Sequence, residues 1–141
     1  MNEFIIKIGN FCIKRLAELI GLGLVAISIL LFISLLSYSP EDPNFIFPEK
    51  TIINNLIGSK GSYISDLFFQ SFGLISILIP ITYFFTGINI IISKTFLIII
   101  ENTFFIILYT FIGCLFFTAF HEKSFWLTAN GNNGFLGNLF E

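Results

Sequence analysis

Few residues in this sequence have the type and spacing that chemistry requires, and they are spread along the chain. Glu101 is the strongest single candidate, because mainly apolar stretches lie on both sides of it. If a helix begins at Thr95, this carboxyl group lies about 9 Å deep and would be an intramembrane proton or ion ligand. If the helix begins near Asn102, Glu101 is an interfacial acid of the first turn beside Lys94. The interfacial interpretation is favoured, and the sequence leaves both open.

The other candidates lack the companions that a site would need. His121 is the single histidine, which excludes a zinc motif with two histidines. Glu41 and Asp42 supply too few oxygens for calcium, which takes about 6–8, so we interpret them as a solvated turn. The sequence GSKGS at residues 58–62 has the wrong order for a phosphate-binding loop, and no serine lies in a GxSxG turn. We therefore expect no catalytic, cofactor or metal site, and no enzyme activity of this segment.

The elements that carry these residues are those of a membrane protein. Of 141 residues, 55% are hydrophobic and 11% are charged, against about 25% charged in ordinary soluble domains. A span of the hydrocarbon core takes about 20 apolar residues. Three uncharged stretches of about that length, at residues 19–40, 67–93 and 102–121, predict spans at about 19–36, 68–92 and 96–120, the last of which includes Glu101. The fold class is an all-α integral membrane bundle, and the lipid bilayer is its first partner.

The two ends of the chain differ from the spans. Polar side chains in residues 1–18 recur with helical spacing, which predicts either an interfacial amphipathic helix or a cytoplasmic extension of the first span. A fourth helix is expected to begin at about residue 134 and to be truncated. Because three basic residues precede the first span, the N-terminus is placed in the cytoplasm and residues 37–65 outside. The basic residues form no cluster that could hold a nucleic acid.

Local chemistry gives two expectations for the second span. Ser62 or Ser65 is a favoured N-cap, and Asp66 would then lie at the positive end of the helix dipole. Pro80 lies in the middle of the span, where proline removes a backbone hydrogen bond and kinks the helix. A neighbour must satisfy the carbonyl that is freed, so Pro80 is expected to face protein rather than lipid.

Three stretches of the sequence resemble the FtsK/SpoIIIE family of DNA translocases. LLSYSPEDPNF at residues 35–45 is similar to the pattern that ends the first membrane helix of the family. The block at residues 54–81 is similar to the one that leads through the second helix, and FWLTANGNNGFLGNLF at residues 125–140 resembles the start of the fourth. The positions that carry the resemblance are Ser37, Pro40, Asp42, Pro43, Gly58, Asp66, Gly73, Pro80, Gly134 and Gly137.

The resemblance implies a function that the residues alone do not. It assigns residues 19–141 to the four-helix membrane domain that anchors a hexameric DNA pump at the division septum of the bacterial inner membrane. It implies a homo-oligomer that meets other division proteins, no cofactor, and a structural role for the motif positions. The ATPase motor would lie outside this chain. The alternative is a free-standing small pore or transporter component, similar to a holin, with Glu101 and Pro80 as its working parts.

Overall fold

The computed structural model describes residues 2–49, 52–121, 127 and 131–140, and all regular elements in these residues are helical. In chain order they are α1 (Asn2–Leu36), α2 (Ser59–Phe72), the 3₁₀ helix η1 (Gly73–Ile77), α3 (Leu78–Ser93), α4 (Ile98–Phe120) and α5 (Gly134–Asn138). The stretches long and apolar enough to cross a membrane are Ile6–Leu36, Ser59–Ser93 and Ile98–Phe120. The chain is therefore an all-α membrane protein, as the sequence predicted.

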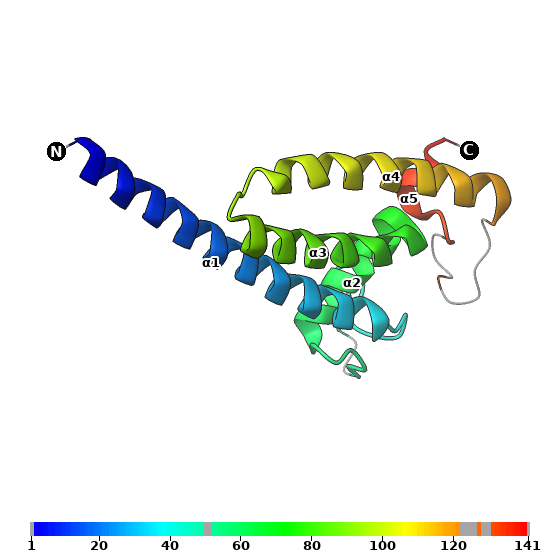
Figure 1. The fold of residues 1–141 in the computed structure, drawn as a ribbon. Helices are drawn as coiled ribbons and strands as arrows, with labels where there is room; N and C mark the ends of the chain where they lie inside the picture. Colours follow the sequence, from blue (N-terminus) through cyan, green and yellow to red (C-terminus); the bar gives the residue numbers. More distant parts are fainter. Residues whose placement is uncertain (1, 50–51, 122–126, 128–130, 141) are drawn as a thin grey trace.

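α1 is one continuous helix of 35 residues. At the usual rise it is about 52 Å long, which exceeds the roughly 30 Å of a hydrocarbon core. Its first turns extend beyond the rest of the bundle, as Figure 1 shows at the N-terminal end. The helix continues through residue 18 without a break, so the geometry is that of an extension of the first span rather than of a separate helix that turns inward.

The most extensive contact between helices is the one between α1 and α3, which lie side by side in Figure 1. Gly21 and Gly87 lie at the crossing. A Cβ atom added to Gly21 would lie 2.8 Å from the carbonyl oxygen of Gly87, and one added to Gly87 would lie 2.7 Å from a methyl group of Val25. Helices in lipid associate mainly through such close approach, which small residues permit.

Polar pairs join α3 to α4. The hydroxyl groups of Thr82 and Tyr109 lie 3.1 Å apart. One turn further along α3, the side-chain amide of Asn102 donates to Thr86 Oγ1 at 2.7 Å. Hydrogen bonds of this kind between helices in a membrane contribute about 0.6–2 kcal/mol each. The α3–α4 contact therefore depends on side-chain hydrogen bonds, whereas the α1–α3 contact depends on close packing.

The second span is not one helix, which corrects the expectation of a kink at its middle. α2 ends at Phe72, and η1 separates it from α3, which begins at Leu78. Gly73 has a φ of +63° and turns the chain at the start of η1. Pro80 is the third residue of α3. The first N–H groups of a helix have no acceptor within that helix, so the missing N–H of Pro80 costs α3 no hydrogen bond. Pro80 is nevertheless fully buried against protein, as expected.

α2 begins earlier than the sequence predicted. Gly58 occupies the N-cap position with a φ of +77°, and the helix begins at Ser59. Ser62 and Ser65 were predicted to cap this helix, but both lie inside it, and Asp66 lies near its middle rather than at its positive end. All three side chains are buried. The capping prediction was wrong because these side chains serve contacts with other parts of the chain.

Candidate functional site

The motif between Ser37 and Asp66 builds a buried polar network at one end of the bundle. Asp42 is at its centre and is only 2% exposed, so it is not the solvated turn residue that we expected. One carboxylate oxygen accepts hydrogen bonds from the backbone N–H and the side-chain amide of Asn54, at 2.8 and 3.0 Å. The other oxygen accepts from the backbone N–H of Asn55 at 2.9 Å.

The prolines on either side of Asp42 explain how the chain enters the network. Proline cannot continue a helix, because it lacks the N–H and clashes with the preceding turn. α1 therefore ends at Leu36, and Pro40 and Pro43 lie in the turn that follows. Pro43 is buried, and its carbonyl oxygen accepts a hydrogen bond from Ser62 Oγ on α2. The rigid turn thus ties the residues around Asp42 to α2.

Asn55 is the second centre of the network and is 5% exposed. Its side-chain amide donates to the carbonyl oxygen of Ser34 at 2.8 Å, with longer contacts of 3.4 Å to the carbonyl oxygen of Ser37 and to Ser65 Oγ. Its own amide oxygen accepts from the N–H of Ile57 at 3.0 Å. The last carbonyl groups of a helix have no partner within it. Asn55 supplies a donor to one of these carbonyls at the end of α1.

Asp66 joins α2 to the residues that follow α1. One of its oxygens accepts from the side-chain amide of Gln70 at 2.6 Å, and the other accepts from the Tyr38 hydroxyl at 3.4 Å. Burial raises the pKa of Tyr38 to about 12, and the nearby Asp66 carboxyl adds to that rise. The phenol therefore remains a hydrogen-bond donor at ordinary pH. Its ring packs on Phe69, with 4.9 Å between the ring centroids.

The chemistry open to these groups is narrow. A carboxylate that already accepts three hydrogen bonds, as Asp42 does, is poorly placed to act as a base or a ligand. Within the part of the chain that the structure describes, no group of three or more His, Cys, Asp or Glu side chains could hold a metal ion. We infer that the network is structural and fixes the loop after α1 against α2.

Two motif glycines from distant parts of the chain meet at the start of η1. Gly73 and Gly134 each have a φ of +63°. The N–H of Leu74 donates to the carbonyl oxygen of Asn132 at 2.9 Å. A Cβ atom on Gly73 would overlap that carbonyl oxygen, and one on Gly134 would overlap the backbone nitrogen of Gly73. Backbone contact this close, at positive φ, requires glycine on both sides.

Gly137 makes a similar contact at α5. A Cβ atom on Gly137 would lie 2.5 Å from the Cβ of Asn133 and 2.7 Å from Thr118 Oγ1. The fully buried side-chain amide of Asn133 donates to Thr118 Oγ1 at 3.2 Å and to Asn138 Oδ1 at 2.6 Å. These contacts fix α5, which begins at Gly134 where the fourth helix was predicted, against α4.

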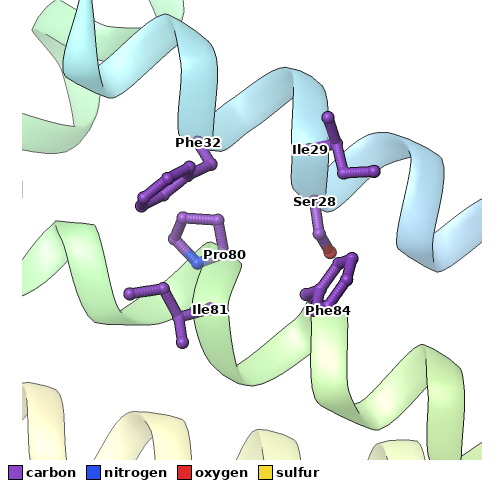
Figure 2. A pocket seen from close by; sticks show the side chains of 6 residues that line it. All are labelled: Ser28, Ile29, Phe32, Pro80, Ile81 and Phe84. Atoms are coloured by element: carbon purple, nitrogen blue, oxygen red, sulfur yellow. The ribbon is translucent and has the colours of Figure 1, made fainter.

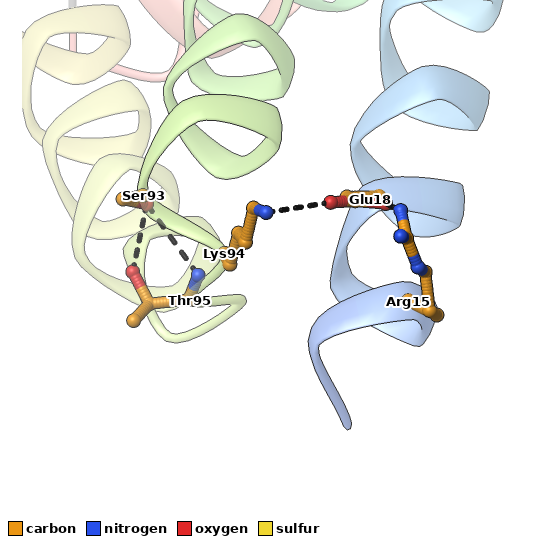
Figure 3. Close-up of polar contacts among 5 residues, drawn as sticks. All are labelled: Arg15, Glu18, Ser93, Lys94 and Thr95. Carbon is orange, nitrogen blue, oxygen red and sulfur yellow. Dashed lines mark hydrogen bonds and ion pairs between the residues drawn. The ribbon is translucent and has the colours of Figure 1, made fainter. Parts of the chain in front are cut away.

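Glu101 lies away from both clusters of motif residues. It is exposed in the first turn of α4, a position in which the helix dipole favours an acid. Lys94 does not pair with Glu101, which corrects the expected neighbourhood. It has a φ of +57° at the C-cap of α3 and pairs with Glu18 on α1 at 3.0 Å. Arg15 contacts the same carboxylate at 2.5 Å, as Figure 3 shows.

Pro80 also lines a groove between α1 and α3, with a volume of about 230 Å³. Figure 2 shows the side chains from the two helices that line it: Ser28, Ile29, Phe32, Pro80, Ile81 and Phe84. The Ser28 hydroxyl donates to the carbonyl oxygen of Leu24 at 2.6 Å and is thus occupied within its own helix. The groove therefore has the chemistry of a contact for acyl chains or apolar side chains rather than of a reactive site.

Several members of the network were not predicted as site residues. Ser34 Oγ donates to the carbonyl oxygen of Gly61 at 2.8 Å, and this hydroxyl lies inside an apolar run that the sequence assigns to a plain span. Asn54 and Asn55 were also missed as hydrogen-bond donors. Two adjacent asparagines that follow a rigid proline turn could have indicated such donors. A polar side chain that becomes buried needs a hydrogen-bond partner.

Comparison with protein families agrees with the resemblance seen in the motifs. The family described as the 4TM region of DNA translocase FtsK/SpoIIIE matches residues 13–141. The chain belongs to this family. The match is to the membrane region of FtsK/SpoIIIE, and it includes both clusters of motif residues. No solved structure matches the chain.

Curated relatives named DNA translocase FtsK are similar over about half of the chain. The one from Rickettsia prowazekii (strain Madrid E) is 41% identical over 71 residues, which are 50% of this chain and 9% of that protein. The one from Rickettsia bellii (strain RML369-C) is 39% identical over 77 residues, or 54% and 10%. The one from Rhizobium meliloti (strain 1021) is 32% identical over 76 residues, or 54% and 8%. The chain thus matches about a tenth of the length of these relatives.

Proposed function

We propose that this chain is the membrane-anchoring and septum-targeting module of an FtsK-like DNA translocase that acts in cell division and chromosome segregation. The observation that carries the proposal is the match of residues 13–141 to the 4TM region of that family. The geometry supports an anchor, because the motif side chains are occupied in internal hydrogen bonds. In this proposal DNA translocation belongs to the motor of the parent protein, and the module binds no nucleic acid.

The proposed orientation places the N-terminus in the cytoplasm and the module in the bacterial inner membrane. Basic residues near the ends of spans favour the cytoplasmic side. Lys7, Lys14 and Arg15 precede the apolar part of α1, and the ion pair of Lys94 with Glu18 brings the turn after α3 to the same end of the bundle. The network around Asp42 would then lie at the outer end.

The proposed partners are further copies of the chain and other division proteins, as the resemblance implies. The three long apolar stretches support a module surrounded by lipid, and large apolar side chains are exposed on each of them. Such faces are available to neighbouring membrane helices as well as to acyl chains. Cross-linking of the chain in its native membrane would test the oligomer directly.

The localisation test uses the chain with a fluorescent protein at its N-terminus in dividing rod-shaped cells. We expect bands of fluorescence at septa. A Glu41→Gln variant serves as the control for a substitution at an exposed position of the motif turn. It should localise in the same way as the unchanged chain. Uniform membrane fluorescence from a chain that remains folded would contradict septum targeting.

The pore alternative predicts a different result in the same cells. A pore that uses Glu101 should conduct protons or small dyes, and Glu101→Gln should reduce that flux. An anchor should conduct neither protons nor dyes, with or without Glu101→Gln. The Glu101→Gln variant of an anchor should still localise at septa. A measured flux that this substitution abolishes would favour the pore over the anchor.

A further inference from the structure

One segment of the chain has most of its polar side chains inside and most of its large apolar side chains outside, although Glu49, Asn54, Ser59 and Lys60 are exposed. We call residues 42–49 and 52–67 the inverted segment. Its buried polar side chains are Asp42, Asn44, Asn55, Ser62, Ser65 and Asp66. Its exposed large apolar side chains include Phe45, Ile46, Ile52, Leu56, Ile64 and Leu67, and those of Phe45 and Leu56 are 69% and 78% exposed. A water-facing loop and helix normally show the opposite arrangement.

The apolar side chains face outward because the backbone behind them is fixed. The side-chain oxygen of Asn44 accepts hydrogen bonds from the N–H groups of Ile46 and Phe47, at 3.0 and 2.7 Å. The ring of Phe45 packs edge-on against Tyr63 of α2, with 4.9 Å between centroids. These contacts hold the loop in one conformation, so its exposed apolar surface is a built feature.

α2 shows the same inversion as the loop. Its buried residues are Gly61, Ser62, Ser65, Asp66 and Phe69, four of which are polar or lack a side chain. Ile64 and Leu67 lie on its exposed face. α2 therefore turns its polar side toward the network and its apolar side away from the protein.

The inverted segment lies beside the last turns of α1 rather than beyond them. Asn55 donates to the carbonyl oxygen of Ser34, and Ser34 Oγ donates to the carbonyl oxygen of Gly61, both at 2.8 Å. The loop thus returns to the level of Ser34, within the apolar stretch Ile6–Leu36. Figure 1 shows the loop between α1 and α2 on the flank of the bundle, with α4 extending further along its length.

We propose that the inverted segment is embedded in the membrane leaflet at this end of the bundle, with its apolar side chains against lipid acyl chains. Irregular backbone at membrane depth is tolerated only where its polar groups are satisfied by the protein. The side chains of Asp42, Asn44 and Asn55 satisfy backbone N–H groups of the loop in this way, at residues 46, 47, 54, 55 and 57. This assignment goes beyond the proposed function and does not depend on it.

Lipid is the occupant because the apolar surface is continuous with the faces of the spans. Leu30 and Leu36 are exposed on the adjoining half of α1, and Leu67 continues the same kind of surface on α2. The exposed charged side chains of the inverted segment are those of Glu49 and Lys60. Lys60, which is exposed near the start of α2, has a long side chain that can reach the headgroups while its backbone stays deeper.

The test uses the full chain in phosphatidylcholine vesicles, with tryptophan fluorescence as the reporter. Trp126→Phe removes the single tryptophan of the sequence, and Leu56→Trp or Ile64→Trp then places one in the inverted segment. Ile107→Trp, at an exposed position of α4 inside the third span, serves as the lipid-facing control. Glu41→Trp, at an exposed position at the edge of the segment, serves as the aqueous control. The quenchers are dibrominated acyl chains in the vesicle and iodide in the buffer.

We expect brominated acyl chains to quench Leu56→Trp and Ile64→Trp within about twofold of the extent for Ile107→Trp, and iodide to quench mainly Glu41→Trp. Strong quenching by iodide at both inverted-segment positions, with little by brominated lipid, would overturn the proposal and place the segment in water. Protection from both quenchers that is lost when the chain is diluted in lipid would also overturn it, because a second copy would then cover the segment. Two positions are used so that a substitution that disturbs the fold at one leaves the other to report.

Discussion

α1 contacts the rest of the bundle in two chemically different ways. Along its middle, the contact with α3 depends on the absence of side chains at Gly21 and Gly87. At its C-terminal end, the contacts with the loop and α2 depend on hydrogen bonds, with Asp42 and Asn55 as the centres. The α1–α3 contact therefore depends on the size of the side chains, and the contacts with the loop and α2 depend on the number and direction of polar groups.

The difference follows from the state of the backbone at each place. In the middle of α1 every backbone group is bonded within the helix, so only close packing is left to favour association. After Leu36 the chain is no longer helical, and its N–H and C=O groups need partners from elsewhere. The network supplies them. We expect substitutions in the network to cost more than substitutions in the glycine contact.

The largest effect is expected for Asp42→Ala. This change leaves three N–H donors without their acceptor. An unsatisfied buried group costs about 1–3 kcal/mol, and because the two donors of Asn54 are only partly buried, the expected loss is about 3–5 kcal/mol. The free energy of unfolding in mixed micelles with a denaturing detergent would measure it. Glu41→Gln is the matched control, with an expected change below about 0.5 kcal/mol. Equal costs for the two substitutions would show that the hydrogen bonds of Asp42 contribute nothing particular.

The next effect is expected for Gly73→Ala, which meets both an unfavourable φ and the carbonyl oxygen of Asn132. Gly58→Ala is its matched control, because Gly58 also has a positive φ but has no described atom within 4 Å of an added Cβ. Backbone strain alone costs about 1–3 kcal/mol. The same unfolding measurement should show Gly73→Ala to be more destabilising than Gly58→Ala. If both cost the same, the close contact with Asn132 would be refuted as the cause.

A smaller effect is expected where size alone decides the contact. Gly87→Val would press on the backbone and Val25 of α1, and overpacking of this kind costs about 1–3 kcal/mol. Gly23→Val is the control on α1, since no described atom lies within 4 Å of its added Cβ. A cross-link between cysteines introduced into α1 and α3 should form more slowly only in Gly87→Val. An equal slowing in Gly23→Val would mean that the helices do not cross at Gly21 and Gly87.

The spans could be predicted from the sequence because they depend on one additive property, the length of uncharged apolar chain. The division of the second span could not, since the predicted span at 68–92 is one uncharged stretch, and the break falls where Gly73 and Leu74 meet the backbone of Asn132. A helix start at about residue 134 was predicted from the resemblance and α5 begins there, whereas a fourth membrane helix that continues from it stays a prediction.

The candidate site was predicted in its positions and not in its arrangement. Asp42 belongs to a recognisable motif, but an acid beside prolines also fits a solvated turn, and only contacts with Asn54 and Asn55 make it a buried centre. The pairing of Lys94 with Glu18 joins residues far apart in the chain, and local spacing suggested Glu101 instead. The periodicity of the sequence does not specify which polar groups far apart in the chain pair with each other.

The smallest effect is expected at the opposite end of α1, where the contact is an ion pair. Lys94 and Glu18 are both partly exposed to solvent, and ion pairs of this kind contribute little to stability. Lys94→Gln should therefore lower the free energy of unfolding by less than Asp42→Ala, Gly73→Ala or Gly87→Val, and salt in the buffer should reduce the difference further. Lys14→Gln, at an exposed lysine near this end of α1, is the control and should change less than Lys94→Gln. A loss from Lys94→Gln as large as that from Asp42→Ala would mean that charge, and not the buried network, holds α1 in the bundle.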